Sequence, residues 1–324
     1  MADKRSKRRE EMSRLHGEIW DATISSGIKR ANELLDAKAP KRPGHLLHFT
    51  SAGALANILS ERALRLTRAR SSNDPKELAH GIDLARIEQD KLTRSRLDEI
   101  FRDELTAHFA GRMTDGTEHR SIDPHVCCLT ETRSADVVAH WAMYGRGGSG
   151  FALKIRGKAM IAKPDVALVK INYKKEEQRA HLREVLAIGR ETSHQAAEFA
   201  TKRFGSGWGQ RSFKIAAHAF GGIISLHAAT MKAPEFAAEK EWRIVHTGMS
   251  TDEQGNPRIE ARGAILRSYF DMKFEPEDLV SVIVGPVHAD LNRPIVCRLL
   301  QENGYHTTQV ETGRVALRAL HEGI

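Results

Sequence analysis

Cysteine is scarce in this chain, with three cysteines in 324 residues. Cys127 and Cys128 are adjacent and cannot readily bridge each other, and Cys297 stands alone. The spacing predicts neither a disulfide framework nor a CxxC metal motif. This pattern is typical of a reducing compartment, and we expect a cytoplasmic location.

Long apolar runs are missing as well. No stretch of about 18 consecutive apolar residues occurs, so we expect no transmembrane helix. The first residues lack the apolar core of a secretory signal, so export by that route is not expected.

The chain does have enough apolar residues for a core, together with an excess of positive charge. Hydrophobic residues make up 40% of the sequence, which excludes wholesale disorder. The formal net charge of +8 indicates an anionic partner, such as nucleic acid, a dinucleotide or a membrane surface. Part of this excess is local, because five basic residues lie within the first ten: Lys4, Arg5, Lys7, Arg8 and Arg9.

The N-terminal part is predicted to be a basic helical arm over residues 1–40. Residues 3–36 show an apolar stripe at helical spacing, with Arg and Lys covering the other side. This surface is either a binding arm for an acidic partner or an ordinary solvated helix face. Residues 39–44 contain two prolines and a glycine and end the helix. We expect residues 41–324 to form a single α+β domain of the catalytic type.

Periodicity within that domain predicts short strands separated by long helices. Strands are expected at 45–50, 64–67, 125–130, 151–155, 166–173, 264–272, 279–285 and 305–310. Helices are expected within 76–110, 134–144, 175–204 and 213–231, and after Pro286 to about 302. The fold class is therefore α+β, with a mixed, mostly antiparallel central sheet and long helical insertions.

The stretch Pro234–Val245 is the most distinctive part of the sequence. It reads as a loop that leads into a short strand, with Glu239 and Glu241 two residues apart. In an extended segment, both carboxylates and Arg243 share one face. Like charges at this spacing repel, so the cluster indicates a site. The alternative is a solvated edge strand with an acid–base ladder.

Other candidate residues lie near predicted strand ends. His48 lies where the first strand meets a helix, and it is either a ligand contact or a satisfied structural histidine. Asn73 lies in a turn that starts a helix. Trp141 and Tyr144 precede the glycine-rich loop 146–150, and they either stack on a flat ligand or belong to the core. The glycine loop lacks both the P-loop ending and the GxGxxG spacing.

Several segments, taken in order, resemble a widespread bacterial family of uncharacterised domains over roughly residues 45–312. The motifs are His48-Phe49-Thr50, Asn73-Asp74-Pro75 with Glu77, Cys128-Leu129-Thr130, Trp141 with Tyr144 and Gly150, Phe236 with Glu239-Lys240-Glu241-Trp242-Arg243, and Ile283-Val284-Gly285-Pro286. That family in turn resembles the ADP-ribosyltransferase fold. The Ser-Thr-Ser strand of some transferases has no clear counterpart here, and the first-strand residue is His rather than Arg.

The resemblance implies that NAD is the substrate and that no metal is required. By analogy with the catalytic Glu-x-Glu turn, Glu241 is the catalytic acid, assisted by Glu239 and His48. By the same analogy, His48 binds the adenosine ribose or a phosphate, and Tyr144 or Trp141 stacks on the nicotinamide ring. The residues expected to bind the cofactor are His48, Thr50, Asn73, Trp141, Tyr144 and Arg243.

The function implied is an NAD-consuming enzyme that passes ADP-ribose to nucleic acid, protein or water. Such an enzyme fits a toxin or a phage-defence effector, with a neutralising partner and without a membrane partner. One alternative is a metal-dependent nuclease that uses Asp74, Glu77, Glu239 and Glu241 as ligands. Another is a non-catalytic module that binds nucleic acid or a protein partner, in which the acids are structural.

Overall fold

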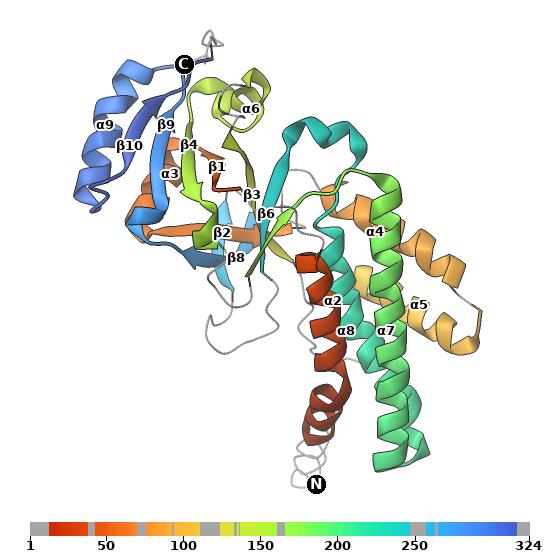
Figure 1. The fold of residues 1–324 in the computed structure, drawn as a ribbon. Helices are drawn as coiled ribbons and strands as arrows, with labels where there is room; N and C mark the ends of the chain where they lie inside the picture. The colour runs from red at the N-terminus through yellow and green to blue at the C-terminus, as the bar shows by residue number, and fades with distance from the viewer. Residues whose placement is uncertain are drawn as a thin grey trace. The chain divides into compact units, whose positions relative to one another are not determined.

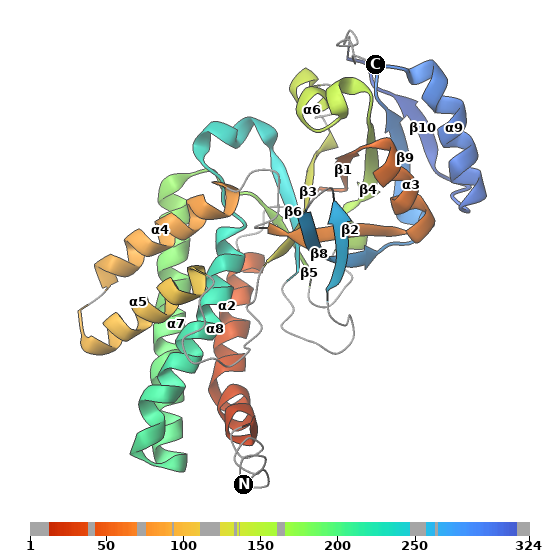
Figure 2. The ribbon, with the colours of Figure 1, turned by 180° about the vertical axis from the view of Figure 1, so that it is seen from behind.

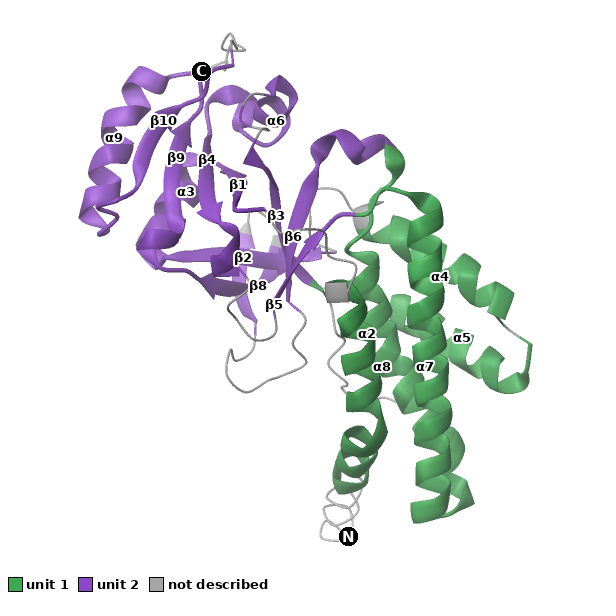
Figure 3. Cartoon of the chain, in the orientation of Figure 1, with its two compact units in different colours: residues 1–38, 73–124, 172–234 green, residues 39–72, 125–171, 235–324 purple. Residues whose placement is uncertain are grey.

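The chain forms two compact units, each assembled from three separate segments (Figure 3). The helical unit consists of Met1–Lys38, Asn73–Pro124 and Asn172–Pro234, and the sheet unit of Ala39–Ser72, His125–Ile171 and Glu235–Ile324. The computed structural model describes residues 13–37, 43–69, 76–92, 94–110, 124–132, 135, 137–160, 166–246, 257–262 and 265–315. This division differs from the predicted arm plus single domain, because the N-terminal helix belongs with the other helices.

The helical unit is built around α8, which packs against α4, α5 and α7 (Figure 1). Its elements are a helix over 13–19, the π-helix η1 (Trp20–Ile24), α2 (Ser25–Ala37), α4 (Lys76–Leu92), α5 (Arg96–Phe109), α7 (Lys175–Phe204), η6 (Ser206–Trp208) and α8 (Gly209–Ala228). The predicted helical span 76–110 is two helices, because Ser95 and Asp98 form a capping box that starts α5. No helix in the described ranges is long and apolar enough to cross a bilayer.

The predicted N-terminal arm packs into the helical unit over the part that the structure describes. Leu15, Ile19 and Ile28 are buried, which confirms the predicted apolar stripe. Arg30 of α2 makes a two-bond ion pair with Glu191 of α7, both at 3.0 Å. Residues 14–35 therefore act as one wall of the helical unit, while the basic residues before position 13 lie outside the described part.

Two helices of this unit approach each other closely where α4 crosses α8. A Cβ added to Gly81 would lie 2.7 Å from the backbone Cα and the carbonyl oxygen of Ala228. Because backbone atoms cannot retreat as a flexible side chain does, only glycine fits at this crossing.

Within the described ranges, the sheet unit carries one open sheet of ten strands. The strands are β1 (His45–Thr50), β2 (Ala63–Arg68), β3 (His125–Glu131), β4 (Phe151–Arg156), β5 (Val166–Lys170), β6 (Glu241–His246), β7 (Arg258–Arg262), β8 (Ile265–Lys273), β9 (Leu279–Val284) and β10 (Gln309–Thr312). The order is β10-β9-β4-β1-β3-β2-β8-β7, with β6 pairing β3 and β5. Among the strands of the described residues, β10 and β9 pair in parallel and the other pairs are antiparallel. The predicted α+β class with a mostly antiparallel sheet is therefore confirmed.

Short helices connect these strands. They are α3 (Ala52–Glu61), α6 (Val138–Met143), η4 (Arg146–Gly148), η5 (Gly157–Met160), η7 (Pro234–Glu239), η8 (Pro276–Asp278) and α9 (Ala289–Glu302). Ser51 caps α3, with its hydroxyl accepting a hydrogen bond from the Ala54 amide. The β9-α9-β10 segment is the predicted strand–helix–strand unit at the C-terminal end.

Strand β3 is the branch point of the sheet. One edge of β3 pairs with β1 near Thr130 and with β2 near Val126, whereas β6 runs along its other edge. β1 and β2 therefore diverge from a single edge, leaving a fork beside Cys127–Leu129 (Figure 2). The strands that carry His48 and Glu241 are both direct neighbours of β3.

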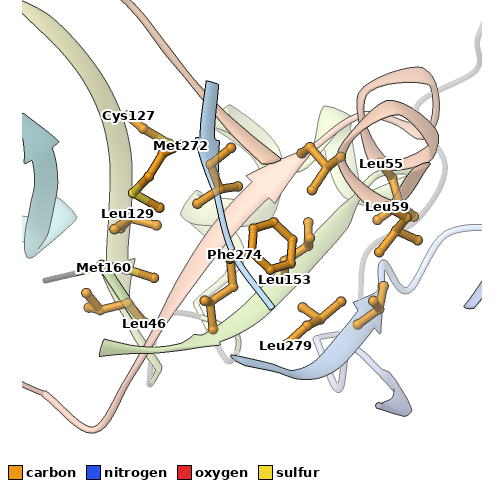
Figure 4. Close-up of a cluster of buried hydrophobic side chains, with 14 of the residues drawn as sticks. Leu46, Leu55, Leu59, Cys127, Leu129, Leu153, Met160, Met272, Phe274 and Leu279 are labelled. Atoms are coloured by element: carbon orange, nitrogen blue, oxygen red, sulfur yellow. The ribbon is translucent and has the colours of Figure 1, made fainter. Parts of the chain in front are cut away.

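The main core of the sheet unit lies on one face of β3 and β6, under α3 and α9 (Figure 4). Alternation along the strands directs Cys127 and Leu129 of β3, and Trp242 and Ile244 of β6, into this cluster. The intervening residues of both strands, including Glu241 and Arg243, point to the opposite face. The core members drawn with labels are Leu46, Leu55, Leu59, Cys127, Leu129, Leu153, Met160, Met272, Phe274 and Leu279.

The crossing of α4 and α8 gives a stability prediction. We expect Gly81→Ala to lower the free energy of unfolding by about 1–3 kcal/mol, because the added methyl group forces the backbones apart. Gly17→Ala is the matched control, since that helical glycine is exposed and nothing lies within 4 Å of its added Cβ. It should be neutral or stabilise by up to about 1 kcal/mol. Urea unfolding followed by circular dichroism measures both; equal midpoints for the two variants would contradict the packing argument.

Candidate functional site

The acidic stretch forms a turn rather than one continuous strand. Glu239 is the last residue of η7, and β6 begins at Glu241. Between them Lys240 adopts a left-handed conformation with φ of 47°, and its amide donates to the Ala237 carbonyl at 3.3 Å. The expectation that Glu239 and Glu241 share one strand face is therefore wrong, because alternation does not continue through a left-handed residue.

Glu241 and Arg243 do share one face, as alternation predicted. Arg243 donates from Nε to Oε1 of Glu241 at 2.7 Å and from Nη2 to Oε2 at 3.2 Å. Glu241 is 5% exposed and Arg243 is 1% exposed. The strand β6 lies between β3 and β5, so the solvated edge strand is also wrong. Two buried charges of opposite sign are held in a two-bond geometry, which is the strongest form of such a pair.

Glu239 is fixed through its backbone and through its side chain. Its carbonyl accepts a hydrogen bond from the Thr130 hydroxyl at 2.8 Å and another from Nε2 of His140 at 3.1 Å. Its Oε1 accepts from the Tyr144 hydroxyl at 2.5 Å. The turn is thereby tied to β3 and to α6. Sequence reasoning missed His140 and the role of Thr130, although both lie in segments that it had marked.

The two aromatic candidates have different environments. Trp141 is fully buried, and its Nε1 donates a hydrogen bond to the Ala135 carbonyl at 2.8 Å. Its ring packs edge to face against that of Phe49, with 5.0 Å between the ring centres. Trp141 belongs to the core and offers no face to a ligand, so its expected stacking role is not supported by this geometry. Tyr144 is 40% exposed and keeps an accessible ring beside Glu239.

His48 fills the fork between β1 and β2. Its Nδ1 lies 3.0 Å from the Cys128 carbonyl oxygen and 3.6 Å from Sγ of Cys127. A carbonyl only accepts, so Nδ1 carries the proton and donates. Burial lowers the pKa of His48, and the bond to Cys128 partly offsets that shift. The imidazole therefore donates to a carbonyl in the part of β3 that lies between its pairings with β1 and β2.

Strand register separates His48 from Glu241. His48 pairs with Leu153, a member of the main core, and contacts Cys127 on that same face. Glu241 pairs with Thr130 and points to the other face. The analogy in which His48 assists Glu241 requires the two side chains to lie together, and the register of the sheet puts them on opposite faces instead. The pKa of the Cys127 thiol is raised to about 12 by burial and by the Glu241 charge, so Cys127 is not a nucleophile.

The remaining predicted residues contribute less. Thr50 is buried at the end of β1. Asn73 and Asp74 lie outside the described residues, as does the side chain of Glu77. Within the described part of the chain, no three His, Cys, Asp or Glu side chains are placed to hold a metal ion.

The glycine-rich loop makes a tight turn. The amides of Gly148 and Gly150 both donate to the Gly145 carbonyl at 2.9 Å, so they do not point at a ligand. The Gly150 carbonyl accepts from the amide of Gly285 at 2.9 Å. A Cβ on Gly285 would lie 2.1 Å from the Gly148 carbonyl oxygen, which explains why the Ile283–Pro286 motif contains a glycine.

Comparison with known families gives one finding. Residues 140–244 match the model of a family described as "Protein of unknown function (DUF2971)". The match includes Tyr144, Glu239, Glu241 and Arg243, and it agrees with the predicted resemblance to an uncharacterised domain family. No curated protein and no solved structure matches the chain.

The buried ion pair should be essential for folding. We expect Arg243→Met to destabilise the chain by about 3–5 kcal/mol, because it leaves a buried carboxylate without its cation. The double variant Glu241→Gln/Arg243→Met should cost less than Arg243→Met alone. Arg298→Met is the surface control, since Arg298 pairs with Glu302 in solvent, and it should change stability by less than about 0.5 kcal/mol. A cost for Arg243→Met as small as that of Arg298→Met in denaturant unfolding would refute this role.

His48 should make stability depend on pH. The folded pKa lies below the unfolded value of about 6.5, so between the two values the unfolded chain binds a proton that the folded chain does not. Stability is therefore full above about pH 6.5 and falls as the pH drops through this window. His48→Leu should flatten that dependence and cost about 1–3 kcal/mol at neutral pH, because the Cys128 carbonyl loses its donor. Unfolding curves across the pH range, with exposed His306→Leu as control, measure both effects; unchanged pH dependence in His48→Leu would contradict the assignment.

Proposed function

We propose that the protein is an NAD-consuming enzyme of the ADP-ribosyltransferase type, with Glu241 as its catalytic acid. The observation that carries this proposal is the Glu239-Lys240-Glu241 turn, formed by η7, a left-handed Lys240 and the start of β6. The sequence resemblance was to a catalytic Glu-x-Glu turn, and a turn is what this segment forms. The transferase-like fold itself is part of the proposal.

The two acids of the turn have complementary environments. Glu241 is buried, and two hydrogen bonds from Arg243 fix the direction of its carboxylate. Glu239 is half-buried and holds the hydroxyl of Tyr144. A carboxylate with a fixed orientation can stabilise a planar, cationic sugar, and a neighbouring aromatic ring can stack on a flat leaving group.

The reaction needs little more than this. The bond between nicotinamide nitrogen and ribose C1′ breaks, and nicotinamide leaves as a neutral molecule with the bonding electron pair. The ribose passes through an oxocarbenium-like state, as in other glycosyl cleavages. Glu241 stabilises that cation, and such electrostatic stabilisation contributes on the order of a few kcal/mol. The acceptor then adds at C1′ and loses its proton.

Tyr144 is the proposed platform for nicotinamide. Its ring is accessible, and its hydroxyl is anchored on Oε1 of Glu239, so the ring orientation is set by the same turn that starts β6. His48 is proposed to support the site from the fork as a structural residue, since register puts it on the other face. The excess of positive charge favours nucleic acid as acceptor, consistent with a toxin or defence effector that a partner neutralises.

A non-catalytic binding module is the second candidate, and burial favours it. The Glu241–Arg243 pair is almost fully enclosed, which is how a purely structural ion pair looks. The two candidates differ in one respect: a structural pair affects stability only, whereas a catalytic Glu241 also affects turnover in a chain that is still folded.

The test is release of free nicotinamide from NAD by the whole protein, with RNA, DNA and protein acceptors supplied in turn. Glu241→Gln should reduce release by at least about 100-fold, and Tyr144→Phe and Glu239→Gln by smaller factors, because they loosen the platform rather than remove the charge. Glu235→Gln is the matched control, since it removes an exposed acid from the same turn.

Thermal melting of each variant separates loss of fold from loss of chemistry. Release that persists in folded Glu241→Gln would remove Glu241 as the catalytic acid. No release by the unmodified protein with any acceptor would favour the binding module, and cutting of nucleic acid that requires a divalent metal would favour the nuclease alternative.

A further inference from the structure

The turn between α7 and α8 lies at one end of the helical unit and has an unusual composition (Figure 1). Gly205 has φ of 96°, a conformation that glycine adopts without strain, and it ends α7 sharply. The following short turn η6 consists of Ser206, Gly207 and Trp208. A tryptophan in a three-residue polar turn is half-buried there, although the helical unit has a large core that could enclose it.

Trp208 is the end of a row of aromatic rings. The rings of Trp208 and Phe204 are 5.9 Å apart at 60°, and those of Phe204 and Phe199 are 6.2 Å apart at 80°. All three side chains are half-buried. Because the rings meet edge to face instead of stacking on one another, they do not cover each other's flat faces.

Arginines already occupy positions over two of these rings. The guanidinium of Arg211 lies 5.4 Å from the Trp208 ring centre, and that of Arg203 lies 5.6 Å from the Phe204 ring centre. Both arginines are exposed. Cations over ring faces hold the rings and the guanidiniums in fixed mutual positions.

Positive charge at this end exceeds the negative charge near it. Arg203 shares Glu18 with Arg14, and Lys202 pairs with Glu198. Arg211 has no acidic partner among the residues that the structure describes. The surface therefore combines two exposed guanidinium groups, of which that of Arg211 has no acidic partner in the described residues, with half-buried aromatic rings.

We infer that this aromatic–arginine tip, made of Phe199, Arg203, Phe204, Trp208 and Arg211, is a binding site for single-stranded nucleic acid. Unstacked bases lie on aromatic faces or guanidinium planes, and the phosphates pair with the arginines. A duplex fits poorly, because its bases are stacked on each other. A membrane surface is disfavoured because the turn itself is polar and the aromatic side chains are half-buried, whereas interfacial binding needs a broad exposed apolar face. The site is separate from the proposed NAD chemistry and does not depend on it.

The experiment measures binding of the full-length protein, without NAD, to fluorescein-labelled single-stranded RNA and DNA of about 20 nucleotides by fluorescence polarisation over a range of salt. Arg203→Ala/Arg211→Ala should weaken binding at least about 10-fold and lower the salt slope by about 1.4, because each phosphate contact on a single strand contributes about 0.7. Lys174→Ala/Arg298→Ala is the matched control. It removes two exposed positive charges elsewhere and should leave the affinity and the slope nearly unchanged.

Trp208→Leu should weaken binding by about 5- to 150-fold, the range expected for a lost base–aromatic stack, and Trp208→Phe should recover part of that loss.

Equal effects of the two double variants, or stronger binding to duplex than to single strands, would overturn the site. Binding to phosphatidylserine vesicles but not to single strands would overturn it in favour of a lipid surface. Both arginines are exposed, so the Arg203→Ala/Arg211→Ala arm stays decisive even if Trp208→Leu fails to fold. Nicotinamide release without an acceptor should be the same in both arginine variants, so failure of this site and failure of the proposed enzyme are distinguishable.

Discussion

The buried pair of Glu241 and Arg243 is the interaction on which the sheet unit depends. It lies on β6, an inner strand whose six residues are all buried, in contact with both β3 and β5. Removing two charges from water costs several kcal/mol for each ion, and only mutual contact with good hydrogen-bond geometry offsets that cost. The two-bond contact meets this requirement. Because one acid then needs one specific arginine two residues further on, the strand has to start at Glu241 and to keep its register against β3.

That constraint explains the turn before the strand. Glu239 cannot continue the strand, because Lys240 takes a left-handed conformation and Thr130 and His140 hold the Glu239 carbonyl. The hydroxyl of Tyr144 reaches the Glu239 carboxylate from α6. A buried charge, a turn and an exposed aromatic ring are thus parts of one hydrogen-bonded assembly, and the proposed chemistry uses each of them.

The predictable parts of this fold were those with a local signal. The long helices and the apolar strand β9 follow from periodicity, and the Glu241–Arg243 contact follows from alternation alone. The features that could not be predicted depend on contacts with residues far away in the sequence. The left-handed position 240 is occupied by lysine, so no glycine or asparagine signals it in the sequence. Strand β7 was not predicted, because its alternating segment Arg258–Arg262 is only five residues long. The face of His48 depends on how β1 pairs with β3, so its separation from Glu241 needs the register and not the sequence. Trp141 and Tyr144 are both aromatic residues just before the glycine-rich loop, so the sequence does not distinguish them. The packing shows that Trp141 is buried and Tyr144 is exposed.

The interleaving of the two units has a consequence for how the polypeptide is made. Each unit takes its segments from the beginning, the middle and a later part of the chain, so neither can close its core while only the first half has been synthesised. Helix α2 packs against α7 and α8, which are synthesised much later than α2. Strand β1 pairs with β3 and β4, and the other partners of those two strands include β6 and β9, which also come late in the chain. Contacts between residues so far apart in sequence slow folding and leave apolar surfaces uncovered for longer. No single cut in the chain therefore separates the two units, and a circular permutation does not separate them either, because their segments alternate three times along the sequence.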